Sequence, residues 1–335
     1  MSLLDRIAER HPVVAHDGRS GALIERGVLD DGTHVYIKTC EVATDVGQLL
    51  TGDARRELRL WRDGILDTLP APIGCALVGI EDLGDQLVTV TRDLGDTVLH
   101  WDVQLAPDQV RRILHGISEV HADFAGSTPT WLCPLATRLA MFAPSRLDTI
   151  RRANPDLAAA VARGHELFHD LVPAEIADAV HYCYDNPDRL AAALTAHAPT
   201  TLLHGDFFLV NIALDHDEVI PLDWGLATAG PAVIDLITFC VGAMSNVTFD
   251  REQFLAEAAN ECRQHTDAET FQLGEFWALM ELGWNKALDA IDHPDPHKRV
   301  TERADLEFWV ARSRRALDAG LVPDPPRRQQ ERARP

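Results

Sequence analysis

The sequence lacks several features that mark whole classes of protein. Its six cysteines are scattered and form no C-x-x-C pair, which favours reduced, buried thiols in a cytosolic protein over a disulfide framework. No apolar run approaches the roughly 20 residues that span a bilayer, so we expect no membrane partner. The opening segment, MSLLDRIAERHP, has no uninterrupted apolar stretch, so we expect a short amphipathic helix there and not a signal peptide.

Basic residues are also few. The 335 residues include 31 Lys and Arg against 52 Asp and Glu, which gives a formal net charge of −21. Nucleic-acid binding needs a clustered basic surface, so we expect no such partner. A cationic ligand suits this charge better, although solubility is the more ordinary reason for an acidic surface. The length suits one large two-lobed domain or two ordinary ones.

The pattern of the first 95 residues predicts a small sheet with one helix. Asp30-Asp31-Gly32 predicts a hairpin turn. Leu58, Trp61 and Ile65 fall on one helical face. We therefore expect two strands within 12–29, further strands over 33–40, 73–80 and 85–95, and a helix in the second half of 44–66.

Helices are expected to dominate after residue 95. Residues 107–126 carry apolar side chains at helical spacing. Three short strands are expected between 200 and 223, and further helices over 232–244, 250–265, 269–291 and 302–320. The predicted fold class is thus α+β and bilobal, with lobes over 1–94 and 95–320. The Pro- and Arg-rich tail over 321–335 is predicted to be disordered.

Lys38 ends the strand segment Val35-Tyr36-Ile37-Lys38. A strand lysine that points into a cleft can pair with nucleotide phosphates, but it needs a carboxylate to hold it. Glu57, nineteen residues later on the predicted helix, suits that role. The alternative is a solvated lysine and an unrelated helical glutamate.

The stretch LLHGDFFLVNIALDHDEVIPLDWG, over 202–225, carries the most chemistry. Asp206 lies in a loop between strands, where a carboxylate can accept a proton from a hydroxyl. Asn211 and Asp223 offer the hard oxygen ligands that Mg²⁺ prefers. His204 has no His or Cys at zinc-ligand spacing nearby, so we expect it to pack against the loop. An exposed hairpin turn is expected at Asp215, Asp217 and Glu218.

Two more side chains have open interpretations. Asp235 lies among apolar residues, and a buried carboxylate must be hydrogen-bonded. It either caps a helix or ties down the loop that carries Asp206. His121 falls beside an apolar helix face and is interpreted as a core histidine.

Taken in order, V-x-I-K, a helical Glu, H-G-D-x-x-x-x-N and D-W-G resemble the aminoglycoside phosphotransferase family. This family is the small-molecule branch of the protein-kinase-like fold, whose protein kinases carry H-R-D-x-x-x-x-N and D-F-G. The resemblance covers roughly residues 12–300. Gly205 replaces the arginine of protein kinases, so no activation-loop switch is expected.

The resemblance implies an ATP- and Mg²⁺-dependent phosphotransferase, with GTP as the alternative nucleotide. Lys38 would bind the α- and β-phosphates with Glu57 as its ion-pair partner, and Asp206 would be the catalytic base. Asn211 and Asp223 would hold Mg²⁺, while Asp235 would brace the catalytic loop. The N-terminal lobe would bind the nucleotide through a hinge over 91–95 (Arg92, Asp93 and Leu94) and a phosphate loop over 16–21 (Ser20 and Gly21). This loop lacks G-x-G-x-x-G.

The acceptor would be a hydroxyl-bearing small molecule. Residues 231–300 hold twelve acids against five bases, which would attract an aminoglycoside or another amine-bearing alcohol. An ordinary acidic surface explains the same excess. Trp277 and Trp284 would stack on such a ligand or, as their spacing of seven favours, pack in the core.

Three functions remain open from the sequence. The favoured one is a small-molecule kinase with an alcohol group as acceptor, in antibiotic resistance or in metabolism. The second is a catalytically silent nucleotide-binding or interaction module, although the presence of Lys38, Asp206, Asn211 and Asp223 counts against it. The third is a metal-dependent hydrolase that uses His204, Asp206 and Asp223. The sequence leaves open whether the protein is a monomer or a homodimer.

Overall fold

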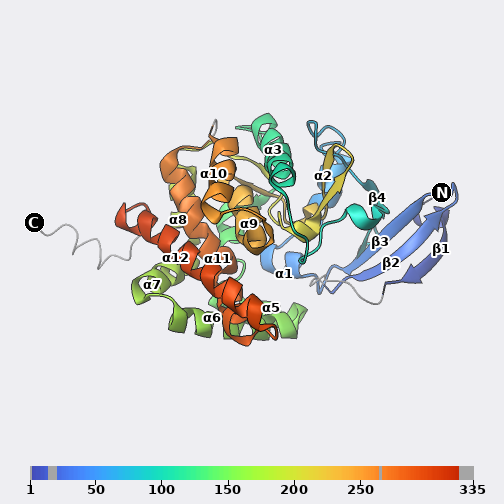
Figure 1. Ribbon diagram of the computed structural model, residues 1–335. Coiled ribbons are helices and arrows are strands. Elements are labelled where there is room, and N and C mark those ends of the chain that lie inside the picture. The colour runs from blue at the N-terminus through green and yellow to red at the C-terminus, as the bar shows by residue number, and fades with distance from the viewer. Residues whose placement is uncertain (1, 14–20, 264–265, 324–335) are drawn as a thin grey trace, which may run out of the picture.

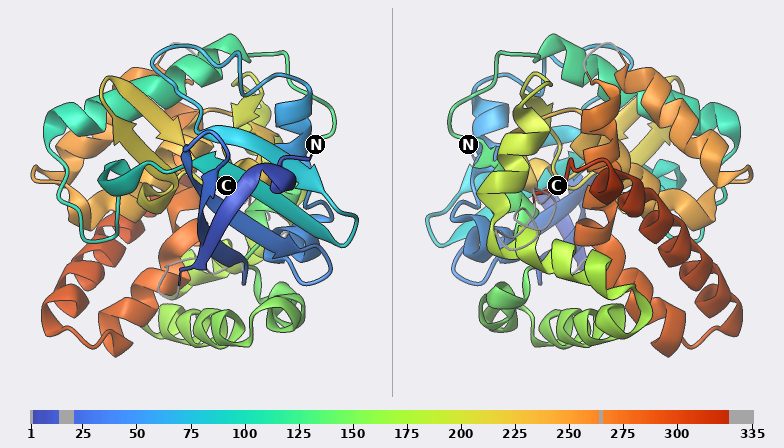
Figure 2. Two further views of the ribbon diagram at one scale, coloured as in Figure 1. Left: turned by 90° about the vertical axis from the view of Figure 1, so that its right-hand side faces the viewer. Right: turned by 90° about the vertical axis from the view of Figure 1, so that its left-hand side faces the viewer.

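A sheet at one end and a larger helical part at the other make up the chain (Figure 1). The computed structural model describes residues 2–13, 21–263 and 266–323. The predicted α+β class is confirmed. Viewed from the N-terminal end, the sheet lies in front of the helical part (Figure 2, left).

The N-terminal sheet has five antiparallel strands in the order β1-β2-β3-β5-β4. Their bounds are Ile7–Pro12 (β1), Leu23–Leu29 (β2), His34–Glu41 (β3), Leu77–Asp82 (β4) and Gln86–Arg92 (β5). The predicted hairpin joins β2 to β3, and Gly32 supplies the positive φ of 85° that this turn needs. Because side chains alternate along a strand, Val35 and Ile37 of β3 fill the sheet core while Lys38 takes the opposite face.

The prediction of an N-terminal helix is wrong. A single 3-10 turn over Leu4–Arg6 leads directly into strand β1, which pairs with β2. The amphipathic pattern is satisfied instead by packing Leu3, Leu4 and Ile7 on the core of the sheet. The free edge of β2 therefore outweighs a weak local helix preference.

The helix predicted in the second half of 44–66 is present as α2 (Arg56–Arg62), and a short helix that was not predicted, α1 (Val46–Thr51), precedes it. Helix α1 ends at Gly52, whose φ is 78°. Leu58 and Trp61 lie on α2, whereas Ile65 lies beyond its end. This break allows α2 to point Arg56 and Glu57 toward the helical part, as described below.

Ten helices are described in the C-terminal part. They are α3 (Pro107–Asp123), α4 (Leu135–Leu139), α5 (Leu147–Ala153), α6 (Pro155–Leu171), α7 (Ala174–Asp185), α8 (Pro187–Thr195), α9 (Val233–Ala243), α10 (Arg251–Cys262), α11 (Ala268–Asp292) and α12 (Pro296–Asp318). All five predicted helices of this region are present. Helix α12 starts six residues earlier than predicted, because Asp295 caps its N-terminus and Pro296 occupies the first helical position.

The three predicted short strands are confirmed as β7 (Thr201–Leu203), β8 (Ile212–Asp215) and β9 (Glu218–Pro221). Two strands of two and three residues were not predicted, β6 (Cys133–Pro134) and β10 (Thr228–Gly230). Strand β10 lies between β6 and β7, and β8 pairs with β9. The loop after β7 and the turn after β9 are thereby fixed at both ends.

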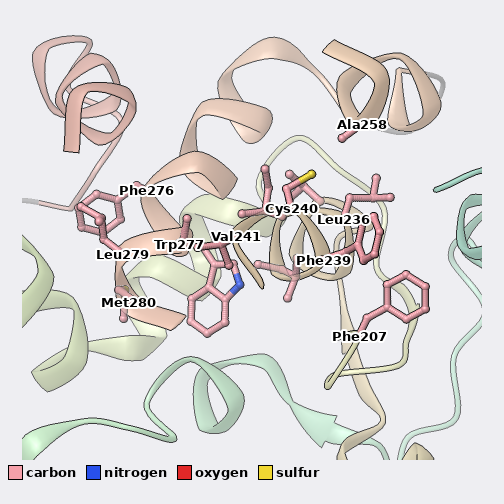
Figure 3. Close-up of a cluster of buried hydrophobic side chains, with 14 of the residues drawn as sticks. Phe207, Leu236, Phe239, Cys240, Val241, Ala258, Phe276, Trp277, Leu279 and Met280 are labelled. Atoms are coloured by element: carbon pink, nitrogen blue, oxygen red, sulfur yellow. The ribbon is translucent and has the colours of Figure 1, made fainter. Parts of the chain in front are cut away.

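The C-terminal core centres on α9 and α11 (Figure 3). Every residue of α9 except Gly242 is buried, and apart from Asp235 and Thr238 the buried side chains are apolar, as expected for a fully enclosed helix. Trp277 and Trp284 are 1% and 2% exposed. Their interpretation as core residues is confirmed, and neither can stack on an acceptor.

The C-terminal core extends slightly past residue 320. Val322 is buried against it, so the predicted disordered tail does not start at 321, and residues 324–335 lie outside the described part. In that described part, no helix has the combined length and apolar character that crossing a bilayer requires.

Candidate active site

The site begins with a sharp turn after β7. Gly205 has a φ of 81°, and a Cβ placed on it would lie 2.0 Å from the carbonyl oxygen of Leu226. Only glycine fits both the backbone conformation and this close approach. The glycine of the H-G-D motif is therefore required by sterics, independently of any regulatory role.

Asp235 fixes this turn by hydrogen bonds to its backbone. It lies in the first turn of α9 and is fully buried. Its carboxylate accepts the amide hydrogens of His204 (2.7 Å) and Gly205 (3.0 Å), and the Nε2 atom of His121 lies 3.1 Å from it. Burial alone would raise the pKa of Asp235, but His121 and these amides hold it below its usual value. Asp235 thus contacts the loop, while His121 is a buried residue behind it.

His204 anchors the loop through both ring nitrogens. Nε2 lies 2.9 Å from the carbonyl oxygen of Leu222, so it carries the proton, and Nδ1 accepts the amide hydrogen of Asp206 at 3.2 Å. Burial lowers the pKa of His204, which agrees with a neutral ring. The ring also packs on Trp224, with centroids 4.7 Å apart. Because both nitrogens are engaged, neither is offered to a metal, and the hydrolase interpretation lacks the histidine ligand that it requires.

Asp206 and Asn211 are joined directly. The side-chain amide of Asn211 donates to the Asp206 carbonyl (2.9 Å) and to its carboxylate (2.8 Å). This leaves the Asn211 side-chain oxygen for another partner. Burial raises the pKa of Asp206 to about 7, Arg138 opposes the rise, and Asp223 adds to it. Such a carboxylate is a suitable general base near neutral pH.

Asp223 follows β9 and pairs with Lys38 from the N-terminal sheet. The Lys38 Nζ and Asp223 Oδ2 atoms are 2.5 Å apart, although 185 positions separate the two residues. Asp223 has a φ of 64°, which a non-glycine residue rarely adopts. Burial would raise its pKa, but the Lys38 ammonium lowers it below the usual value. The carboxylate is therefore ionised; Lys38 contacts Oδ2, and the backbone of Gly225 also hydrogen-bonds to the carboxylate.

Glu57 is not the ion-pair partner that the sequence predicted for Lys38. Among the ion pairs of the described residues, Lys38 joins Asp223. Glu57 instead accepts the amide hydrogen of Trp224 at 3.2 Å. Burial and Asp223 raise the pKa of Glu57 to about 7, while Lys38 lowers it, so Glu57 still lies within electrostatic reach of Lys38. The contact to Trp224 links α2 to the D-W-G turn.

These oxygens fit a magnesium ion. The Asn211 side-chain oxygen and the Asp223 carboxylate are hard oxygen donors, and Mg²⁺ needs only one or two protein ligands beside phosphates. No group of three or more His, Cys, Asp or Glu side chains in the described ranges is arranged to hold a metal. These residues therefore do not form a closed metal site made of protein ligands alone.

The family model for the phosphotransferase enzyme family, APH, matches residues 53–268. The match spans more than half of the chain. The protein belongs to this phosphotransferase family.

Solved structures share the fold of this phosphotransferase. Spectinomycin phosphotransferase APH(9)-Ia, in complex with ADP and spectinomycin, is 13% identical over 92% of each chain, with a TM-score of 0.55. A choline kinase from Cryptosporidium parvum is 10% identical over 95% of this chain and 92% of its own, with a TM-score of 0.54. APH(3'')-Id from Streptomyces rimosus, with ADP and streptomycin, is 16% identical over 79% and 94%, with a TM-score of 0.50. No curated protein sequence matches the phosphotransferase.

The predicted hinge is more constrained than expected. The amides of Arg92 and Asp93 donate to the carbonyls of Ala76 and His34, so these two donors are not available to adenine. Leu94 is buried beside them. The Arg92 side chain pairs with Asp215 at 3.0 Å. Asp215 is therefore half-buried and linked to the hinge, and its interpretation as an exposed turn residue is wrong.

Of the predicted phosphate loop over 16–21, the described residues include Gly21. Ser20 lies outside the described residues, whereas Gly21 is exposed with a φ of 75° and open space around its Cα.

Arg138 is a site residue that the sequence analysis missed. It is 1% exposed on α4, and its Nε atom donates to the Gly205 carbonyl at 2.6 Å. It also forms two hydrogen bonds with Glu281 of α11. A signal was present, because Arg138 stands in the apolar segment LATRLAMF, where a charge needs a partner.

Replacing Asp235 tests whether its carboxylate holds the loop. Asp235→Asn keeps the shape but offers one acceptor and one donor to two amide hydrogens, so a buried group loses its partner. We expect the free energy of unfolding in urea to fall by about 2–3 kcal/mol. The exposed Asp217→Asn should change it by less than about 0.5 kcal/mol. Equal stability of the two variants would contradict the bracing role.

Proposed function

We propose that the protein is an ATP- and Mg²⁺-dependent phosphotransferase that moves the γ-phosphoryl group to a hydroxyl of a small molecule. The observation that carries this proposal is one cluster that joins both parts of the fold. It contains the Lys38–Asp223 pair and the Asn211–Asp206 hydrogen bond. Asp206 and Asp223 also lie near enough for the second to raise the pKa of the first.

Each side chain of the cluster has one task in the proposal. Lys38 binds the α- and β-phosphates once nucleotide competes for its ammonium, and Asn211 and Asp223 hold the metal. Mg²⁺, when bound, neutralises charge on the β- and γ-phosphate oxygens. Asp206 orients the acceptor hydroxyl and takes its proton. Phosphoryl transfer needs positioning and charge more than covalent help, and these residues are of the kind that supplies both.

The hinge and the phosphate loop are proposed as nucleotide contacts, with fewer backbone groups available than the sequence analysis expected. Leu94 remains a candidate for a backbone contact to adenine, since the amides of Arg92 and Asp93 are engaged in the sheet. Gly21, with Ser20 before it, is the proposed phosphate-loop contact. The lobes over 1–94 and 95–320 take the nucleotide and the acceptor, respectively.

An amine-bearing alcohol is the proposed acceptor. The names of structurally similar proteins include two aminoglycoside-type antibiotics and choline, and the net charge of −21 favours a cation. The acidic excess of 231–300 contributes less than its count implies. Asp235, Glu275 and Glu281 are buried, so they do not face a ligand.

A turnover screen tests the proposal. We expect consumption of ATP, or of GTP, together with a phosphate-sized mass gain on one member of a panel of aminoglycosides, macrolides, cyclic-peptide antibiotics and amino alcohols. Asp206→Ala should abolish the gain, because the base is lost, and the exposed Asp217→Asn should preserve it. Nucleotide binding without turnover of any acceptor would instead favour the catalytically silent module.

Removing the proposed metal carboxylate should separate chemistry from folding. In Asp223→Ala, kcat with Mg²⁺ and ATP should fall by about 100- to 1,000-fold, the scale of losing one electrostatic contact to the transition state. The fold should persist, because Lys38 and Asp223 are 25% and 39% exposed and Lys38 can hydrate when unpaired. Circular dichroism checks the fold. Turnover at the wild-type rate would remove Asp223 from the metal site.

The raised pKa of Asp206 predicts the acid side of the pH profile. A general base acts in its deprotonated form, and the pKa of Asp206 is about 7. As the pH falls below that value, the protonated, inactive fraction grows, so kcat/KM should fall about tenfold per pH unit. Asp217→Asn should show the same profile as the wild type. A rate that stays constant down to pH values well below 7 would contradict Asp206 as the base.

A further inference from the structure

Arg138 places a buried positive charge against the loop that carries Asp206. It is 1% exposed, and Glu281, its partner, is equally buried. A buried ion pair is expensive, and apolar residues of similar volume often replace one without loss of stability. The stability of the core therefore does not explain why a guanidinium occupies this position.

Every nitrogen of the guanidinium has a partner. Nη1 and Nη2 donate to the two carboxylate oxygens of Glu281 at 2.9 and 2.5 Å, and Nε donates to the Gly205 carbonyl at 2.6 Å. The group also lies over the ring of Trp277, 5.4 Å from its centroid. Its plane is thus fixed by α11 on one side, and its Nε–H donor points at the loop.

The Gly205–Asp206 peptide unit is held at both of its polar ends. Arg138 binds its carbonyl, and Nδ1 of His204 accepts its amide hydrogen. Asp235 binds the amide of Gly205, which belongs to the preceding peptide unit. Rotation of this peptide plane would swing the Cα–Cβ bond of Asp206, and with it the carboxylate.

From this geometry we propose that Arg138 is a positioning residue for Asp206: it fixes the Gly205–Asp206 peptide plane, and Glu281 fixes Arg138. The inference rests on the proposed function in so far as Asp206 is the base. It assigns Arg138 no contact with acceptor, nucleotide or metal. The competing explanation is that the pair only joins α4 to α11.

A paired substitution separates the two explanations. Arg138→Met alone leaves Glu281 buried without a partner and loses stability under either one. The double variant Arg138→Met/Glu281→Met removes both charges at similar volume, so its melting temperature should recover most of the loss of the single variant, short of the cost of the unpaired carbonyl. Its Gly205 carbonyl still lacks a donor. We expect kcat to stay about 100-fold low, the cost of a misplaced catalytic group, with the KM for ATP unchanged.

Recovery of kcat together with stability in the double variant would overturn the inference. If the double variant does not fold, Arg138→Lys decides. Lysine keeps a charge for Glu281 but cannot reach Glu281 and the Gly205 carbonyl together. It should fold and show at least about a tenfold loss of kcat. Wild-type kcat in Arg138→Lys would likewise overturn the inference.

Lys286, which lies on α11 like Glu281, provides a matched control. It is buried on α11, pairs with Glu302 (3.0 Å) and Asp305 (3.4 Å) of α12, and makes none of the loop contacts described above. Lys286→Met should lower the melting temperature and leave kcat of the folded protein unchanged. A loss of kcat equal to that of the Arg138 variants would show that any broken buried pair has this effect, and would overturn the inference.

Hydrogen exchange keeps this test independent of the proposed function. By mass spectrometry, amides of 203–208 should exchange at least about tenfold faster in Arg138→Met/Glu281→Met than in the wild type or Lys286→Met, because the loop opens locally. Unchanged exchange would overturn the positioning role. Faster exchange in a protein that phosphorylates no acceptor would leave the positioning of the loop standing and refute the proposed function.

Discussion

The clamped peptide unit between Gly205 and Asp206 is the constraint on which the site depends. Buried groups of opposite charge approach this turn from different elements, Asp235 from α9 and Arg138 from α4. Neither charge is tolerable alone in a core, so each needs the backbone groups of the turn as much as the turn needs them. The apolar packing of α9 against α11 (Figure 3) thus has a second effect, since it sets where Asp235 and Glu281, the partner of Arg138, lie.

The second half of the site depends on contacts between the sheet and the helical part. Lys38 reaches Asp223 from β3, while Arg56 and Glu57 of α2 hold the backbone of the D-W-G turn. Glu57 accepts the Trp224 amide, and Arg56 lies 3.5 Å from the Gly225 carbonyl. Two adjacent residues of opposite charge therefore contact backbone groups of opposite polarity on two adjacent residues of the turn. This arrangement holds the strained Asp223 in its left-handed conformation.

The sequence predicted the elements with strong local patterns. The hairpin at Gly32, the helix over 107–123 and the β8–β9 hairpin follow from turn chemistry and periodicity, which are local. The residues of the cluster were predicted by motif. The ion pair between Lys38 and Asp223 was not predicted, because whether Lys38 pairs with Glu57 or with Asp223 depends on the orientation of α2. Arg138 was missed for the same reason, since Gly205 and Glu281 lie 67 and 143 positions away. The N-terminal strand was missed because its partner strand, not its own sequence, decided its conformation.

Because 185 positions separate Lys38 from Asp223, the two residues are synthesised at different times. The N-terminal sheet leaves the ribosome long before Asp223 is made. Until α3–α8 have folded and β9 has formed, Lys38 has no carboxylate from that turn, and the entropy of closing so long a loop opposes early pairing. The nascent sheet therefore carries an ammonium that lacks its Asp223 partner, on the face that later meets the helical part. That charge keeps this surface hydrated and discourages premature association with other apolar chains.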